Sequence, residues 1–211
     1  MIRFRLPALS ALMLGAAISI ASVPAVHAQA TTAVTAPVQS LDQALDTIQK
    51  KESGSFQART QILAPVVDRV YDLEAVLRSS VGASRYMQLS AEEKQKLLAA
   101  FREYTVARYL SSFKPGSDAK FTLSSEVRPS PVGSDQIVTT HIGSADNMPG
   151  TEIDYILRQE NGAWKIVDVL LDGHISQAAA QRSDFGSTLT SGGVDGLITV
   201  LEQKVKTFSE N

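Results

Sequence analysis

The chain has 211 residues, of which 44% are hydrophobic and 20% are charged, and its formal net charge is −2. A mildly acidic chain lacks the concentrated basic surface that nucleic-acid binding needs, so no nucleic-acid partner is expected. The absence of cysteine excludes disulfides, thiol catalysis and thiolate metal sites. The length suits one domain with a substantial core.

The first 28 residues have the layout of a secretory signal peptide. Arg3 and Arg5 precede an apolar stretch over residues 6–23, and small residues around Ala28 supply a cleavage site. A retained membrane anchor is the alternative, because about 18 apolar residues can just span a bilayer. The cleavage site favours the signal peptide, and we predict that residues 1–28 are removed.

Residues 29–39 are small and polar and contain one proline, which predicts a flexible linker. The linker is expected to lead into a single domain over residues 40–211. No internal repeat divides this domain.

Apolar residues at helical spacing predict two helical stretches in the first part of the domain. Ser40 is expected to cap the first stretch, which Gly54 ends. The second runs from Phe56 to Gly82, with a helix start or a bend at Pro65.

A capping box opens the next predicted helix. In the sequence SAEE, Ser90 accepts a hydrogen bond from an exposed N–H group while Glu93 reaches back, and Pro115-Gly116 ends the helix. Residues four apart form a ladder on one face, which is either ordinary core or the wall of a lipid pocket. The ladder consists of Leu97, Phe101, Thr105, Tyr109 and Phe113, and Tyr104 widens it.

After residue 117 the apolar period changes from 3.6 toward 2, which predicts strands. Asn161-Gly162 is a favoured two-residue hairpin turn, so the last two strands should pair antiparallel. Two helical stretches, at about 175–189 and 193–208, close the chain. The four strands are expected at about 119–127, 135–143, 151–159 and 163–171.

The order of these elements predicts an α+β fold. We expect a curved antiparallel sheet of about four strands, wrapped by N-terminal and C-terminal helices, that encloses an apolar cavity. Both faces of the fourth strand are mostly apolar, so both should be covered. Strand alternation places Ile153, Tyr155 and Leu157 on one face of the third strand, and Val167, Val169 and Leu171 on one face of the fourth.

Residues suited to catalysis are scarce. The predicted domain has two histidines, His141 and His174, with no serine-nucleophile motif and no glycine-rich phosphate loop, so we expect no catalytic residue, metal or cofactor. An enzyme that transfers protons through a buried aspartate and Tyr155 is an alternative. The candidates are Asp154 and Asp168, but alternation puts Asp154 and Tyr155 on opposite faces of the strand.

Four segments, taken in order, carry a family resemblance. They are ILAPVVDRVYD, SVGASRYMQLSAEEKQKLLAAFREYTVARY, GTEIDYILRQENGAWKIVDVLLDGHIS and RSDF. Over about residues 40–208 the chain resembles the MlaC, or toluene-tolerance, family of periplasmic lipid-transport proteins. Because His174-Ile175 separates Gly173 from Ser176, the segment LDGHISQAAAQRSDF is more similar to the hopanoid-associated HpnM branch.

The resemblance implies a soluble periplasmic carrier that holds a phospholipid or a hopanoid-type lipid. Its partners would be membrane complexes of an ABC-type lipid transport system, between which it moves the lipid from one membrane to the other. The alternatives are the proton-transfer enzyme and an interaction module with a filled core. The residues expected to line the lipid cavity are Phe101, Tyr104, Tyr109, Ile153, Tyr155, Leu157, Val167, Val169 and Leu171.

Overall fold

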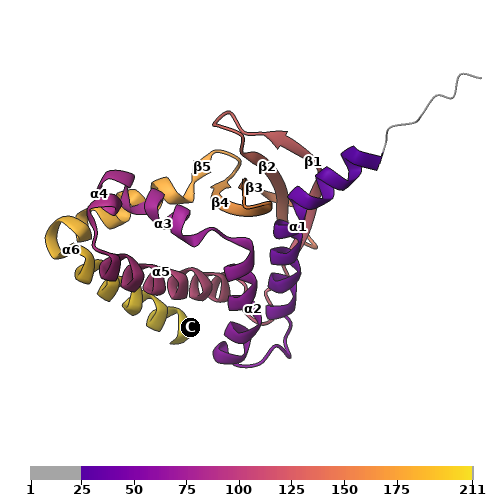
Figure 1. The fold of residues 1–211 in the computed structure, drawn as a ribbon. Coiled ribbons are helices and arrows are strands. Elements are labelled where there is room, and N and C mark those ends of the chain that lie inside the picture. Colours follow the sequence, from indigo (N-terminus) through magenta and orange to yellow (C-terminus); the bar gives the residue numbers. More distant parts are fainter. Residues whose placement is uncertain (1–24, 211) are drawn as a thin grey trace, which may run out of the picture.

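The computed structural model describes residues 25–210, which form six helices and five strands (Figure 1). Most of the predicted signal peptide, residues 1–24, lies outside the described residues, so its removal stays a prediction. The helices before the sheet are α1 (Ala25–Ile48), α2 (Phe56–Val70), α3 (Leu73–Val81), α4 (Ala83–Gln88) and α5 (Ala91–Ser112). The later elements are β1 (Lys120–Pro129), β2 (Gln136–Ser144), β3 (Asn147–Glu160), β4 (Ala163–Leu171), β5 (Ile175–Ser176) and α6 (Gln177–Glu210).

Helix α1 shows that the predicted flexible linker over residues 29–39 is wrong. The helix passes through this whole segment and through Ser40, which therefore does not cap it. Val34 and Val38 are 7% and 0% exposed and belong to the main core. Val34 and Val38 extend the helical spacing of the buried residues Leu41 and Leu45 toward the N-terminus. The free energy gained by burying them outweighs the low helix preference of a small, polar segment that contains Pro37.

The second predicted helical stretch is divided into α2 and α3 at Tyr71 and Asp72. Here the Asp72 N–H donates to the carbonyl of Ile166 at 3.0 Å, and Tyr71 forms a parallel bridge with the same strand residue. The Asp72 carboxylate then accepts a hydrogen bond from the Ala75 N–H at 2.9 Å and caps α3. The contact with β4 thus interrupts the helix and places Tyr71 beside the sheet.

Helix α5 begins at the predicted capping box, which is confirmed. The Ser90 hydroxyl accepts from the Glu93 N–H at 3.2 Å, and the Glu93 carboxylate accepts from the Ser90 N–H at 2.8 Å. At the other end, the buried Arg59 of α2 donates to the carbonyls of Leu110 at 3.0 Å and Phe113 at 3.4 Å. A cation is favourable at this end of the helix dipole.

The sheet has the order β1-β2-β3-β4-β5, and all neighbouring strands are antiparallel. The four longer strands lie where the alternation predicts them, and the two-residue β5 is additional. Asn161 and Gly162 have φ values of 49° and 81°, as the predicted hairpin turn requires.

A bulge in the β3–β4 pair changes which residues of β4 share a face. Tyr155 is paired with Val169, whereas Leu157 is paired with Ile166, so the register shifts between these two pairs. The shift places Ile166 rather than Val167 on the face of Leu157, because the bulge interrupts the alternation.

Two clusters of buried apolar side chains lie within the described residues. The first joins α1, α2 and the C-terminal half of α5 to the sheet and contains Leu41, Leu45 and Tyr155, all at most 1% exposed. The second joins α3, α5 and α6 and contains Phe101 and Leu197. The predicted α+β class, with helices at both ends of an antiparallel sheet, is confirmed.

Helix α6 reverses direction at Gly193, where φ is 62° and ψ is −156°. Its second half returns along α5 (Figure 1). The aromatic rings of both halves contact Tyr104 of α5, with centroid distances of 6.5 Å to Phe185 and 6.2 Å to Phe208. Among residues 25–210, no helix is long and apolar enough to cross a membrane.

Candidate functional site

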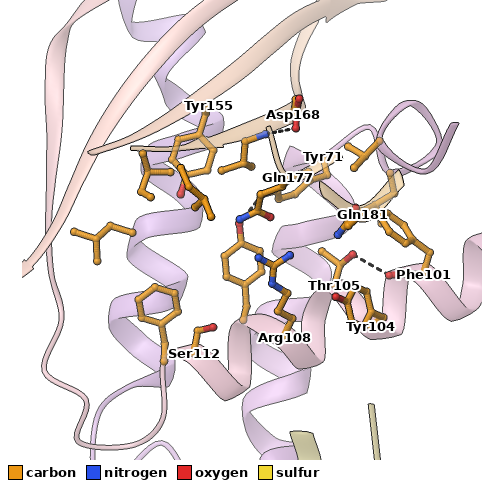
Figure 2. A pocket seen from close by; sticks show the side chains of 18 residues that line it. Tyr71, Phe101, Tyr104, Thr105, Arg108, Ser112, Tyr155, Asp168, Gln177 and Gln181 are labelled. Atoms are coloured by element: carbon orange, nitrogen blue, oxygen red, sulfur yellow. Dashed lines mark hydrogen bonds between the residues drawn. The ribbon is translucent and has the colours of Figure 1, made fainter. Parts of the chain in front are cut away.

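A cavity of about 210 Å³ lies between the sheet and helices α3, α5 and α6, where the two clusters meet (Figure 2). Most of its wall is aromatic or aliphatic. Helix α5 contributes residues at spacings of three and four, so they form one stripe along the helix. The stripe consists of Phe101, Tyr104, Thr105, Arg108, Tyr109 and Ser112.

Seven of the nine residues predicted to line the cavity do so. They are Phe101, Tyr104, Tyr109, Ile153, Tyr155, Val169 and Leu171. That these side chains contact lipid stays a prediction.

The other two predicted lining residues, Leu157 and Val167, are absent from the wall. Leu157 is fully buried within the first cluster and paired with Ile166. Val167 lies at the bulge, which takes it off the face that carries Val169. Simple alternation along β4 therefore misplaced Val167, because it does not allow for the bulge. Leu157 is enclosed by the buried side chains of the first cluster.

The prediction missed two parts of the wall. Tyr71, Leu73 and Val76 come from the α2–α3 junction, and Gln177 and Gln181 come from the first turns of α6. No local pattern marks either part, because each depends on where the helix packs.

Arg108 and Ser112, which were also missed, had a detectable signal. They extend the stripe of Phe101, Tyr104 and Tyr109 at helical spacing along α5. Both side chains are polar, whereas the predicted wall consists of aromatic and aliphatic residues.

Tyrosine hydroxyls provide a polar but uncharged region of the cavity. The hydroxyls of Tyr71 and Tyr109 are 2.5 Å apart. Burial raises the pKa of Tyr71, Tyr109 and Tyr155 above the ordinary value, so all three stay neutral near pH 7. This region can accept an apolar ligand without desolvating a charge.

The aspartates that suggested a proton-transfer enzyme have structural partners. Asp154 is 2% exposed and accepts hydrogen bonds from Arg128 at 2.7 and 2.8 Å, on the face opposite Tyr155. Asp168 reaches the cavity wall, but its carboxylate accepts from the Ser176 hydroxyl at 2.6 Å and from the Ala178 N–H at 3.2 Å. These contacts tie β4 to the start of α6.

The histidines lie away from the cavity wall. His141 on β2 is 3.7 Å from the Glu152 carboxylate on β3. His174 is exposed in the turn before β5, where its ring lies beside the carbonyl of Asp172. Among the described residues, no group of three or more His, Cys, Asp or Glu side chains is placed to hold a metal ion.

Comparison with known proteins identifies relatives of this fold. A solved structure of a phospholipid-binding protein from Ralstonia solanacearum, in complex with a phospholipid, superimposes with a TM-score of 0.69. The two chains share 18% sequence identity, and the match covers 83% of this chain and 98% of the other, which establishes a common fold. A search of curated proteins found no match. A family profile described as MlaC protein matches residues 38–203, most of the chain, and this protein therefore belongs to the MlaC family.

Proposed function

We propose that this protein is a lipid carrier, which binds its ligand without catalysing a reaction. The observation that carries this proposal is the largely apolar cavity between the sheet and helices α3, α5 and α6. The relative from Ralstonia solanacearum holds a phospholipid on the same fold, which supports a lipid as the ligand here. Each buried methylene group contributes about 0.8 kcal/mol, so an apolar wall is sufficient for binding.

The size of the cavity defines how a lipid is held. At about 210 Å³ it is smaller than the roughly 300–1,000 Å³ of pockets for drug-sized ligands. A diacyl lipid therefore requires the wall to widen. Helix α5 contributes Val106 and Leu110 to the first cluster and Phe101 and Tyr104 to the second, so widening the cavity changes the packing of both clusters.

The carrier is proposed to act in the periplasm, between complexes of an ABC-type transport system in the inner and outer membranes. Family membership and the predicted signal peptide over residues 1–28 support this location. The ligand is a phospholipid or, as the similarity of residues 171–185 to the HpnM branch implies, a hopanoid-type lipid.

Lipid extraction tests the function directly. The full chain, purified from a Gram-negative host, is examined by native mass spectrometry, and the bound material is extracted with solvent and identified. A carrier is expected to show a mass increase that extraction removes. Repeated purification without lipid would favour an interaction module with a filled core. Turnover of an extracted or added lipid, with a pH-dependent rate, would favour an enzyme.

A further inference from the structure

Arg108 places a cation on the cavity wall without a partner from the described chain. Its side chain is partly buried and rises from α5 toward Gln177 (Figure 2). Within residues 25–210, no hydrogen bond or ion pair involves its guanidinium. The other arginines that are at least partly buried all have partners: Arg59 has backbone carbonyls, Arg102 has Asp68, Arg128 has Asp154 and Arg158 has Asp135.

The two neighbouring polar side chains of the wall, Asp168 and Gln177, form no hydrogen bond or ion pair with Arg108. Asp168 is the acidic residue of the cavity wall, but Ser176, Val169 and Ala178 already donate hydrogen bonds to its carboxylate. Gln177 is partly buried on the same wall, and its amide makes no hydrogen bond with another described residue. The guanidinium of Arg108 and the amide of Gln177 thus lie on the cavity wall with N–H groups that form no hydrogen bond with the described chain.

We propose that Arg108 and Gln177 bind the phosphate of a phospholipid headgroup, and this assignment rests on the lipid-carrier function proposed above. A guanidinium matches two phosphate oxygens at once, and the amide of Gln177 supplies a further donor. Ser112 of the same stripe is exposed, whereas Tyr155 is 1% exposed, so the wall runs from solvent to the core. The headgroup therefore lies at Arg108 and the acyl chains extend toward Tyr155.

A lipid with an uncharged polar end makes no use of this cation. The proposal thus selects phosphate-bearing lipids over alcohols of similar apolar size, including hopanoid alcohols. The comparison that isolates the phosphate uses phosphatidylglycerol and diacylglycerol with the same acyl chains, each carrying the same fluorophore on one chain.

Both probes are titrated into the full chain after delipidation and refolding. Arg108→Gln is expected to weaken phosphatidylglycerol binding about tenfold or more and to leave diacylglycerol binding within about twofold. Arg108→Lys keeps the charge but lacks the planar guanidinium that binds two oxygens at once, so its affinity for phosphatidylglycerol is expected to lie between those of the wild-type protein and Arg108→Gln. Arg85→Gln is the matched control, because Arg85 is exposed on α4 and off the cavity wall, and it leaves both affinities unchanged.

The possible results separate the two proposals. An unchanged affinity of Arg108→Gln and Arg108→Lys for phosphatidylglycerol, or an equal loss for both lipids, overturns the headgroup assignment while the carrier function stands. Inorganic phosphate that binds the wild-type protein as tightly as phosphatidylglycerol makes this a free-phosphate site and also overturns it. Failure of the wild-type protein to bind either lipid overturns the headgroup assignment, and the carrier function is refuted as well when solvent extraction of the purified protein also yields no lipid.

Discussion

Replacement of Asp42 by asparagine is expected to flatten the pH dependence of the unfolding free energy. Asp42 lies on α1 with 8% of its surface exposed. One carboxylate oxygen accepts a hydrogen bond from Thr140 at 3.0 Å, and the other has no hydrogen-bond partner among the described residues. Burial raises the pKa of this carboxyl from 3.8 to about 7, and the hydrogen bond from Thr140 partly opposes the rise.

The direction of the effect follows from proton binding. Below pH 3.8 the folded and unfolded chains both keep the proton, so Asp42 contributes no pH dependence. Between pH 3.8 and about 7 the unfolded chain releases it and the folded chain retains it, so stability falls as pH rises. The two pKa values differ by about 3.2, which corresponds to a loss of about 4 kcal/mol that is complete above pH 7.

Urea unfolding at a series of pH values measures this loss. From about pH 4 to about pH 8, the unfolding free energy of Asp42→Asn should rise by about 4 kcal/mol relative to that of the wild-type protein. Asp46→Asn is the matched control, since its side chain lies one turn away on α1 and is 56% exposed. Parallel curves for Asp42→Asn and the wild-type protein would refute the assigned burial and proton uptake.

Three further changes test the cavity and its frame. Val169→Trp fills part of the cavity of about 210 Å³ and should reduce co-purified lipid while circular dichroism stays native; unchanged lipid in native mass spectra would contradict the position of Val169 on the wall. Ser90→Ala removes the cap of α5 and should lower the unfolding free energy in urea by about 1 kcal/mol, and a variant of equal stability would show that the cap is dispensable. Arg128→Ala leaves the buried Asp154 without its charged partner and should destabilise the protein by about 3 kcal/mol. The double variant Asp154→Leu, Arg128→Leu should recover part of this loss, and an additive loss would contradict pairing as the cause.

Features that depend on a few neighbouring residues could be predicted from the sequence. The capping box of Ser90 and Glu93 and the hairpin turn of Asn161-Gly162 form as expected, because each requires only local backbone geometry and side chains within reach. The shared face of Phe101 and Tyr109 on α5 likewise follows from helical spacing, and both side chains lie on the cavity wall.

Features that depend on packing could not be predicted in the same way. The N-terminal half of α1 is stabilised by burial of Val34 and Val38, and its composition resembles that of a linker. The place of Val167 depends on a bulge, which two strands determine together. Tyr71 and Gln177 reach the cavity because α3 and α6 approach it from distant parts of the chain.

The contact between Phe208 and Tyr104 has a consequence for biosynthesis. A ribosome releases the chain in order, so α5 and the sheet emerge before the part of α6 that follows the reversal at Gly193. During this interval the aromatic side of α5 lacks its final cover. A nascent chain is therefore prone to aggregate, or to bind a chaperone, until the residues that follow Gly193 have emerged and packed against α5.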